Sequence, residues 1–244
     1  MFAEGMGNMR TRTAFVARQL SPVRAVHGFM LRHSLYPLAL SSLLACGIWV
    51  GRVVRSHSLA GGGLIWNLSL AWVPYLCSLW VAYLHRHHLR QWWRLLIPAG
   101  LWLIFFPNAP YIITDLWHLR EHPPIPMWYD IGFFVTFAWT GCLLGIASLR
   151  TMQSVVQSYL GWFMSWLFTI SVLGLSGFGI YLGRFLGWNS WDLIVNPVAV
   201  LSDMAAWLVH PRTHLQAYLF ALLFAAILFV FYLTFTSVQQ QETS

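Results

Sequence analysis

Polar side chains that could do chemistry gather in one proline-rich stretch, residues 105–130, which reads FFPNAPYIITDLWHLREHPPIPMWYD. It holds five prolines and three of the chain's seven acidic residues, and it follows an apolar run, residues 95–106, typical of a membrane span. Pro107 and Pro110 lack a backbone N–H, so a helix that arrives here must kink or unwind around Asn108. At membrane depth such a break is stable only where it faces protein or water. The break therefore predicts where a polar site would lie.

A helix that resumes at Tyr111 and continues to His122 would carry polar side chains on one face. At 100° per residue, Tyr111, Asp115, His118 and His122 lie within about 60° of one another. Carboxylate and imidazole groups are zinc ligands in sites that keep an open position for water. Asp115, His118 and His122 are therefore a candidate zinc site. A hydrogen-bonded network that only stabilises the fold explains the same polar face.

A second polar stretch, residues 183–192, reads GRFLGWNSWD and follows another apolar run. An arginine this close to hydrocarbon needs an acidic partner, a phosphate or water. Arg184 therefore pairs with an acid of the protein or binds an anionic ligand through its planar fork. The candidate acids are Asp115, Asp130 and Asp192. Asn189 and Ser190 add donors and acceptors of the kind that bind sugars or polar headgroups.

The two stretches together give one set of candidate ligand-binding residues. The set is Asn108, Tyr111, Thr114, Asp115, His118, Asp130, Arg184, Asn189, Ser190 and Asp192. The sequence has no Walker loop, GxSxG elbow, HExxH motif or dinucleotide fingerprint. A catalytic role for any of these residues therefore rests on their clustering alone.

The composition is that of a membrane protein. Of the 244 residues, 58% are hydrophobic and 9% are charged, compared with about 25% charged in a soluble domain. All 14 basic residues are arginine and lie mainly between apolar runs, where a topology signal would place them. Nucleic-acid binding is therefore not expected. The three cysteines lie inside apolar runs and predict core positions, without a disulfide framework.

Six apolar runs are long enough to cross a membrane, which takes about 20 residues. They are residues 34–54, 64–84, 94–114, 128–149, 159–182 and 215–237. Residues 191–209 are also apolar, but Asp192, Pro197 and Asp203 favour a re-entrant or interfacial helix over a seventh span. The predicted fold is an all-α polytopic bundle of about six spans, with the third span broken at the PNAP sequence. Small residues four apart, as in the pairs Gly141 with Gly145 and Gly179 with Gly183, support close helix packing.

The arginines predict an orientation for this bundle. Nine lie in the N-terminal arm or after spans two and four, and five lie on the other side, so both termini are expected in the cytoplasm. The domains are then a basic cytoplasmic arm (1–33), a membrane domain (34–237) and a short cytoplasmic tail (238–244), in the inner membrane of a bacterium. The arm is expected to be either an interfacial helix on an anionic membrane face or a disordered basic tail, and the HRHHLR connection at residues 85–90 is expected to meet anionic lipid headgroups. Both polar stretches fall on the outer face.

Five short sequences within these stretches carry a family resemblance. They are FPNAPY, TDL, WYD, GR and WNSWD, at residues 106–111, 114–116, 128–130, 183–184 and 188–192. In these motifs the chain resembles a bacterial family of multi-pass integral membrane proteins, domain of unknown function 1361. The resemblance covers about residues 40–236 and does not extend to His122. It implies a membrane fold and supplies no reaction.

Three functions are consistent with these observations. The first is the binding or transport of a small polar or lipid-headgroup ligand at the extracytoplasmic face, because broken helices beside polar clusters are typical of transporter sites. The second is a membrane enzyme, with or without a metal, that acts on a lipid headgroup or a lipid-linked sugar; Asp115 would serve as base or ligand and Arg184 would hold phosphate. The third is an assembly or scaffold protein whose polar network only stabilises the fold.

Overall fold

The computed structural model describes residues 27–31, 33–87, 91–120, 124–209 and 214–241. Contacts divide the chain into two units, residues 1–40 and 41–244. In the first unit, a ring nitrogen of His27 lies 2.9 Å from the Tyr36 hydroxyl. Most of the predicted basic arm lies outside the described residues. The second unit holds both polar stretches.

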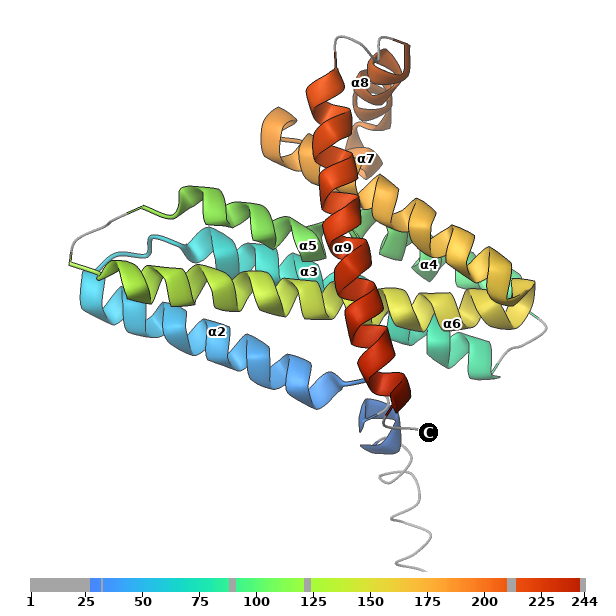
Figure 1. Cartoon of the computed structure of the whole chain (residues 1–244), viewed down its shortest axis with the longest axis horizontal. Helices are drawn as coiled ribbons and strands as arrows, with labels where there is room; N and C mark the ends of the chain where they lie inside the picture. The colour runs from blue at the N-terminus through green and yellow to red at the C-terminus, as the bar shows by residue number, and fades with distance from the viewer. Residues whose placement is uncertain (1–26, 32, 88–90, 121–123, 210–213, 242–244) are drawn as a thin grey trace, which may run out of the picture. The chain divides into compact units, whose positions relative to one another are not determined.

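The regular elements of the described residues are helices, which confirms the predicted fold class (Figure 1). They are α2 (Leu35–Ser56), α3 (Gly62–His87), η1 (Trp92–Leu95), α4 (Leu96–Phe105), α5 (Asn108–Tyr111), η2 (Ile112–His118), α6 (Met127–Tyr181), η3 (Leu182–Leu186), α7 (Asp192–Val195), α8 (Pro197–Val209) and α9 (Leu215–Gln241). Five stretches of the described chain are long and apolar enough to cross a membrane. They are Leu35–Ser56, Gly62–His87, Trp92–His118, Met127–Leu186 and Leu215–Ser237. The chain is therefore a multi-pass membrane protein.

The fourth of these stretches contains two of the predicted spans. Its main helix, α6, has 55 residues and would be about 80 Å long if straight, against a hydrocarbon core of about 30 Å. Gly161 interrupts it with non-helical angles, φ 82° and ψ 176°, and the helix doubles back on itself (Figure 1). Glycine adopts a positive φ without steric strain. Gly161 therefore separates a first arm, residues 127–160, from a second arm, residues 162–181.

The third stretch changes conformation at the proline pair. The α4 helix ends before Pro107, α5 forms a single turn, and η2 tightens into a 3-10 helix. The backbone N–H of Ala109 donates to the carbonyl of Phe106 at 3.2 Å instead of to Phe105. The side-chain amide of Asn108 donates to the Phe105 carbonyl at 3.1 Å. Asn108 thus satisfies a carbonyl that the interrupted helix leaves without its usual partner.

The predicted α-helix through His122 is wrong in two respects. Residues 112–118 have 3-10 geometry, and the helix ends at His118 because Leu119 is extended, with φ −66° and ψ 110°. A 3-10 helix has three residues per turn, so Asp115 and His118 share a face. His122 lies outside the described residues.

One face of α5 packs against the first arm of α6 at glycine positions. A Cβ atom on Gly141 would collide with the carbonyl oxygen of Ala109, and a Cβ on Gly145 would lie 3.4 Å from the Cβ of Ala109. This glycine pair thus allows the backbones of α5 and α6 to touch.

Residues at both ends of α5 meet the second arm of α6 in the same way. A Cβ on Gly179 would lie 2.7 Å from the ring of Pro107, and a Cβ on Gly183, just beyond that arm, would lie 3.0 Å from the ring of Tyr111. The proline-rich turn is therefore packed against two glycine faces, one before and one after the break at Gly161.

A buried ion pair joins α2 to the start of α6. The Arg52 Nε donates to Asp130 Oδ1 at 2.8 Å, and the two side chains are 7% and 1% exposed. A second guanidinium nitrogen of Arg52 donates to the carbonyl of Ala60 at 3.0 Å. Close by, the Tyr129 hydroxyl donates to the carbonyl of Ile48 at 2.7 Å. These contacts fasten residues 48–60 to α6.

The apolar stretch at residues 191–209 contains two short helices, α7 and α8. The α8 helix has 13 residues, about 20 Å at 1.5 Å per residue, whereas a span takes about 20 residues. It is not one of the candidate spans of the described chain.

Alanine at Gly141 or Gly179, the two glycines that lie closest to the proline-rich turn, should lower the thermal stability of the detergent-purified protein. Overpacking costs about 1–3 kcal/mol, which exceeds the gain of about 1 kcal/mol that alanine has over glycine in a helix. Gly141→Ala and Gly179→Ala should therefore lower the apparent Tm by several degrees. Gly132→Ala and Gly174→Ala are matched controls, because a Cβ there meets no atom within 4 Å. Equal Tm values for all four variants would contradict the packing described here.

Removal of one partner of the Arg52–Asp130 pair should destabilise the protein more than removal of both. A lone buried charge costs about 3–5 kcal/mol, whereas an apolar replacement of the whole pair is often neutral. Thermal unfolding of Arg52→Met, Asp130→Leu and the double variant measures this coupling. Additive losses in the double variant would show that the pair does not hold α2 to α6.

Candidate functional site

A cavity of about 290 Å³ lies beside the proline-rich turn. Its walls come from α3, α4, α5, the second arm of α6, η3, residues 188–190, α7 and α8. The polar residues that line it are Asn67, Asn108, Tyr111, Ser176, Trp188, Asn189 and Ser190. The other described lining residues are glycine or apolar, so none of the described residues of the wall is charged.

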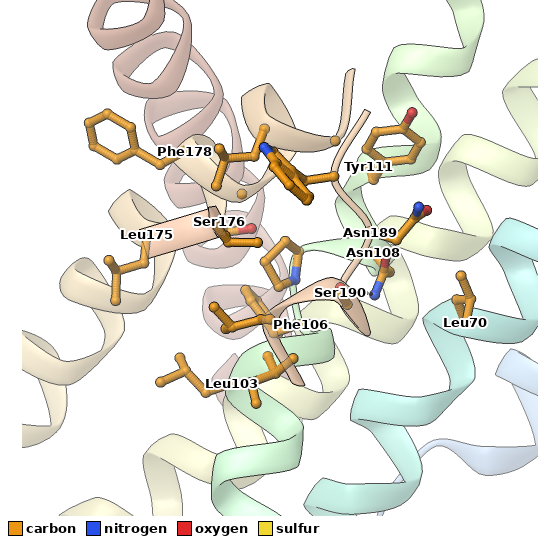
Figure 2. Close-up of a pocket in the computed structure, with 18 of the residues that line it drawn as sticks. Leu70, Leu103, Phe106, Asn108, Tyr111, Leu175, Ser176, Phe178, Asn189 and Ser190 are labelled. Atoms are coloured by element: carbon orange, nitrogen blue, oxygen red, sulfur yellow. Dashed lines mark hydrogen bonds between the residues drawn. The ribbon is translucent and has the colours of Figure 1, made fainter. Parts of the chain in front are cut away.

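Three polar residues of the cavity gather on one side of it. Figure 2 shows Asn108, Asn189 and Ser190 together on one side, with Leu103 and Leu175 on the other. The Asn108 side chain donates from Nδ2 to the Ser190 hydroxyl at 2.7 Å, which ties α5 to the segment after η3. The cavity therefore presents a polar cluster opposite a wall that is mainly apolar and includes Ser176.

Ser176 places a buried polar atom on this cavity. Its side chain is 1% exposed, and its Oγ has no hydrogen-bond partner among the described residues. Two other buried hydroxyls of the same arm donate to backbone carbonyls: Ser165 to Trp162 at 2.7 Å and Thr169 to Ser165 at 2.9 Å. A buried polar group without a partner costs about 1–3 kcal/mol.

A cluster of ionisable side chains lies next to this cavity, centred on Asp115. Its Oδ2 accepts from Asn67 Nδ2 at 2.8 Å, and its Oδ1 accepts from Arg184 Nη1 at 3.3 Å. His118 Nδ1 lies 3.9 Å from Asp115 Oδ1 and 3.0 Å from Arg184 Nη2. Because a guanidinium only donates, that histidine nitrogen accepts in this arrangement. Of the three candidate acids, Asp115 is therefore the partner of Arg184.

Three of the predicted site residues have other contacts. Asp130 pairs with Arg52. Thr114 donates to the carbonyl of Tyr111 at 2.7 Å, and Asp192 accepts from the backbone N–H of Asn189 at 2.7 Å. Asp130 is thus paired with a residue of α2, and the polar groups of Thr114 and Asp192 make hydrogen bonds within their own local segments. The other seven predicted residues fall into two groups, four that line the cavity and three that are Asp115, His118 and Arg184.

Asn67 joins the two groups, because it lines the cavity and also donates to Asp115. Sequence reasoning missed Asn67, Ser176 and the pairing of Arg52. Each is a polar residue in a mainly apolar helix, which is the signal that could have indicated them.

The predicted zinc site is not assembled within the described part of the chain. No group of three or more histidine, cysteine or acidic residues is placed there to hold a metal ion. Asp115 and His118 supply two ligand types, and the third predicted ligand, His122, is not among the described residues. His118 also directs Nδ1 to a guanidinium, whose positive charge disfavours a bound cation.

Thermal unfolding of Asp115→Asn, Arg184→Gln and the double variant tests the ion pair beside the cavity. Each single change should lower the apparent Tm, because an unpaired ionisable group near hydrocarbon is costly. The double variant should lose less than the sum of the two single losses, since its remaining groups are both neutral. Asn67→Ala should weaken this coupling, because Asn67 also donates to Asp115. Strict additivity would contradict the pairing.

Comparison with known proteins finds a match to one protein family. No curated protein and no solved structure matches the chain. The family model described as "Protein of unknown function (DUF1361)" matches residues 66–231. That range includes both polar stretches and all the described residues that line the cavity. Because the match covers more than half of its length, the chain belongs to this family of proteins of unknown function.

Proposed function

We propose that the chain binds an amphipathic membrane molecule, a lipid with a small headgroup, in the cavity beside α5. The observation that carries the proposal is the division of the cavity into an apolar wall and a wall with Asn108, Asn189 and Ser190. Small-molecule sites are mostly apolar, with a few placed polar groups that orient the ligand. A lipid would set its headgroup against the polar wall and its first chain carbons against the apolar wall.

Access from the bilayer supports a lipid rather than a water-soluble ligand. Leu103 and Leu175 line the cavity, yet their side chains are 42% and 50% exposed. Both belong to stretches that are apolar enough to cross the membrane, so their exposed surface would face hydrocarbon. A ligand would thus enter sideways from the membrane, and the remainder of its chains would stay in the bilayer.

The volume of the cavity suits such a partial insertion. At about 290 Å³ it is close to the lower end of ligand pockets, about 300 Å³, and about twice the volume of an engineered cavity that binds benzene. A headgroup with the first part of a chain would fill it. On the arginine distribution, the site lies at the extracytoplasmic face of a bacterial inner membrane. Transport of the lipid would use the same site.

Binding is a better account than catalysis because the ionisable groups are occupied with one another. Asp115, Arg184 and Asn67 are linked by hydrogen bonds of 2.8 and 3.3 Å. Asn67 lines the cavity, but the two charged residues of this group do not. No charged side chain of the described wall is therefore in a position to act as base or to hold phosphate at a cavity-bound ligand.

A bulky residue at Val200 should expel a bound lipid. Val200 lines the cavity and is 4% exposed, whereas Val198, two residues earlier on α8, is 80% exposed and outside the wall. Native mass spectrometry of the purified protein should detect a retained lipid in the wild type and in Val198→Trp. Val200→Trp should retain several-fold less, and Ser176→Leu, which changes the wall on α6, should have the same effect.

Thermal unfolding identifies which variants are folded, so loss of lipid is scored only for those. Equal lipid retention in wild type, Val200→Trp and Ser176→Leu would refute the assigned site. Complete absence of lipid from the wild type in mild detergent would refute the proposed role.

A further inference from the structure

We infer that the cavity selects an uncharged lipid whose headgroup donates hydrogen bonds, such as a hydroxyl headgroup, over lipids with a phosphate or carboxylate. This inference rests on the lipid-binding role proposed above and specifies the class of ligand. It follows from the hydrogen-bonding capacity that the protein leaves unused in the wall of the cavity.

The described wall offers no charge to balance an anionic headgroup. None of its residues is arginine, lysine, histidine, aspartate or glutamate. Arg184 follows Gly183, a wall residue, along the chain, but its guanidinium donates to Asp115 at 3.3 Å and lies 3.0 Å from His118. An ionised group in such a site keeps its charge only at a high desolvation cost. Phosphate and carboxylate headgroups are therefore disfavoured.

The amide of Asn67 is oriented by Asp115. The carboxylate of Asp115 is paired with Arg184 and can only accept hydrogen bonds. The Asn67 nitrogen must therefore face Asp115, and its Nδ2 donates a hydrogen bond to Asp115 Oδ2 at 2.8 Å. The Oδ1 of Asn67 is then left as a hydrogen-bond acceptor, on a residue that lines the cavity.

The amide of Asn108 is oriented in the same way by different groups. Its Nδ2 donates to the carbonyl of Phe105 at 3.1 Å and to the Ser190 hydroxyl at 2.7 Å. A backbone carbonyl can only accept, so the nitrogen must face Phe105, and both amide hydrogens are used. The Oδ1 of Asn108 therefore remains as a second acceptor on the wall of the cavity.

Two serine hydroxyls also belong to residues that line the cavity. Ser176 Oγ is buried without a partner, and Ser190 accepts from Asn108, so its own hydrogen is left to donate. A headgroup hydroxyl can donate to one asparagine oxygen and accept from a serine. A carboxylate or a fully ionised phosphate can only accept, and it would face the two asparagine oxygens without a hydrogen to offer. The unused groups thus fit a lipid alcohol.

Two short lipids separate these classes, because dioctanoylglycerol and dioctanoyl phosphatidic acid have the same chains and differ by the phosphate on one hydroxyl. Each is titrated into the purified full-length protein in detergent, with native mass spectrometry and thermal shift as readouts. We expect dioctanoylglycerol to bind at least about tenfold more tightly, and Val200→Trp to abolish that binding. Ser176→Ala should weaken it by about 3- to 10-fold, the effect of one lost hydrogen bond.

Ser165→Ala is the matched control for Ser176→Ala, because Ser165 is buried in the same arm but donates to Trp162 and does not line the cavity. Phosphatidic acid that binds as tightly as the diacylglycerol, and is displaced in Val200→Trp, would overturn the selectivity and leave the lipid-binding role intact. Binding of neither lipid in a manner sensitive to Val200→Trp would overturn both.

Discussion

Close backbone packing around the proline-rich turn is the contact on which the rest of this membrane domain depends. Pro107 and Pro110 interrupt the third apolar stretch, and the turn between them can be buried only where a neighbouring helix has no side chain in the way. Glycines before and after the Gly161 break meet this condition, because a Cβ at Gly141 or Gly179 would strike the turn. The same contact directs Asn108 toward the segment after η3 and so creates the polar wall of the cavity.

The ionisable groups near the membrane follow one physical constraint. A charge close to hydrocarbon is stable only with a partner and with its remaining hydrogen-bonding capacity satisfied. Arg52 satisfies it with Asp130 and the carbonyl of Ala60, and Arg184 with Asp115 and His118. Arg184 follows the wall residue Gly183 in the chain, but its pair with Asp115 keeps its charge out of the wall, which is polar and uncharged. On the proposed function, that separation of charge from cavity favours a neutral amphiphile over an anion.

Asn67 connects these two features of the structure. Its amide nitrogen completes the coordination of Asp115, and the residue also forms part of the cavity wall. The ion pair therefore determines which end of the Asn67 amide is available to a ligand, although neither charged partner lines the cavity. On the proposed lipid-binding role, Asp115 and Arg184 would be positioning residues that act on the wall through Asn67, without direct contact with a ligand.

The sequence by itself determined the membrane class, the helical fold, the break at Pro107 and Pro110, and the two stretches that hold most of the cavity's polar residues. Those features are local, since composition, apolar run length and proline chemistry act within a few residues of the chain. Only the tertiary structure decided that Arg184 pairs with Asp115 rather than Asp130 or Asp192, that Asp130 belongs to Arg52, and that residues 112–118 form a 3-10 helix. It also decided that Ser176 lacks the backbone bond that Ser165 and Thr169 make. The reason is that such partners lie up to 78 residues apart, and helix packing, which no local pattern records, selects one pairing among several that are chemically equivalent.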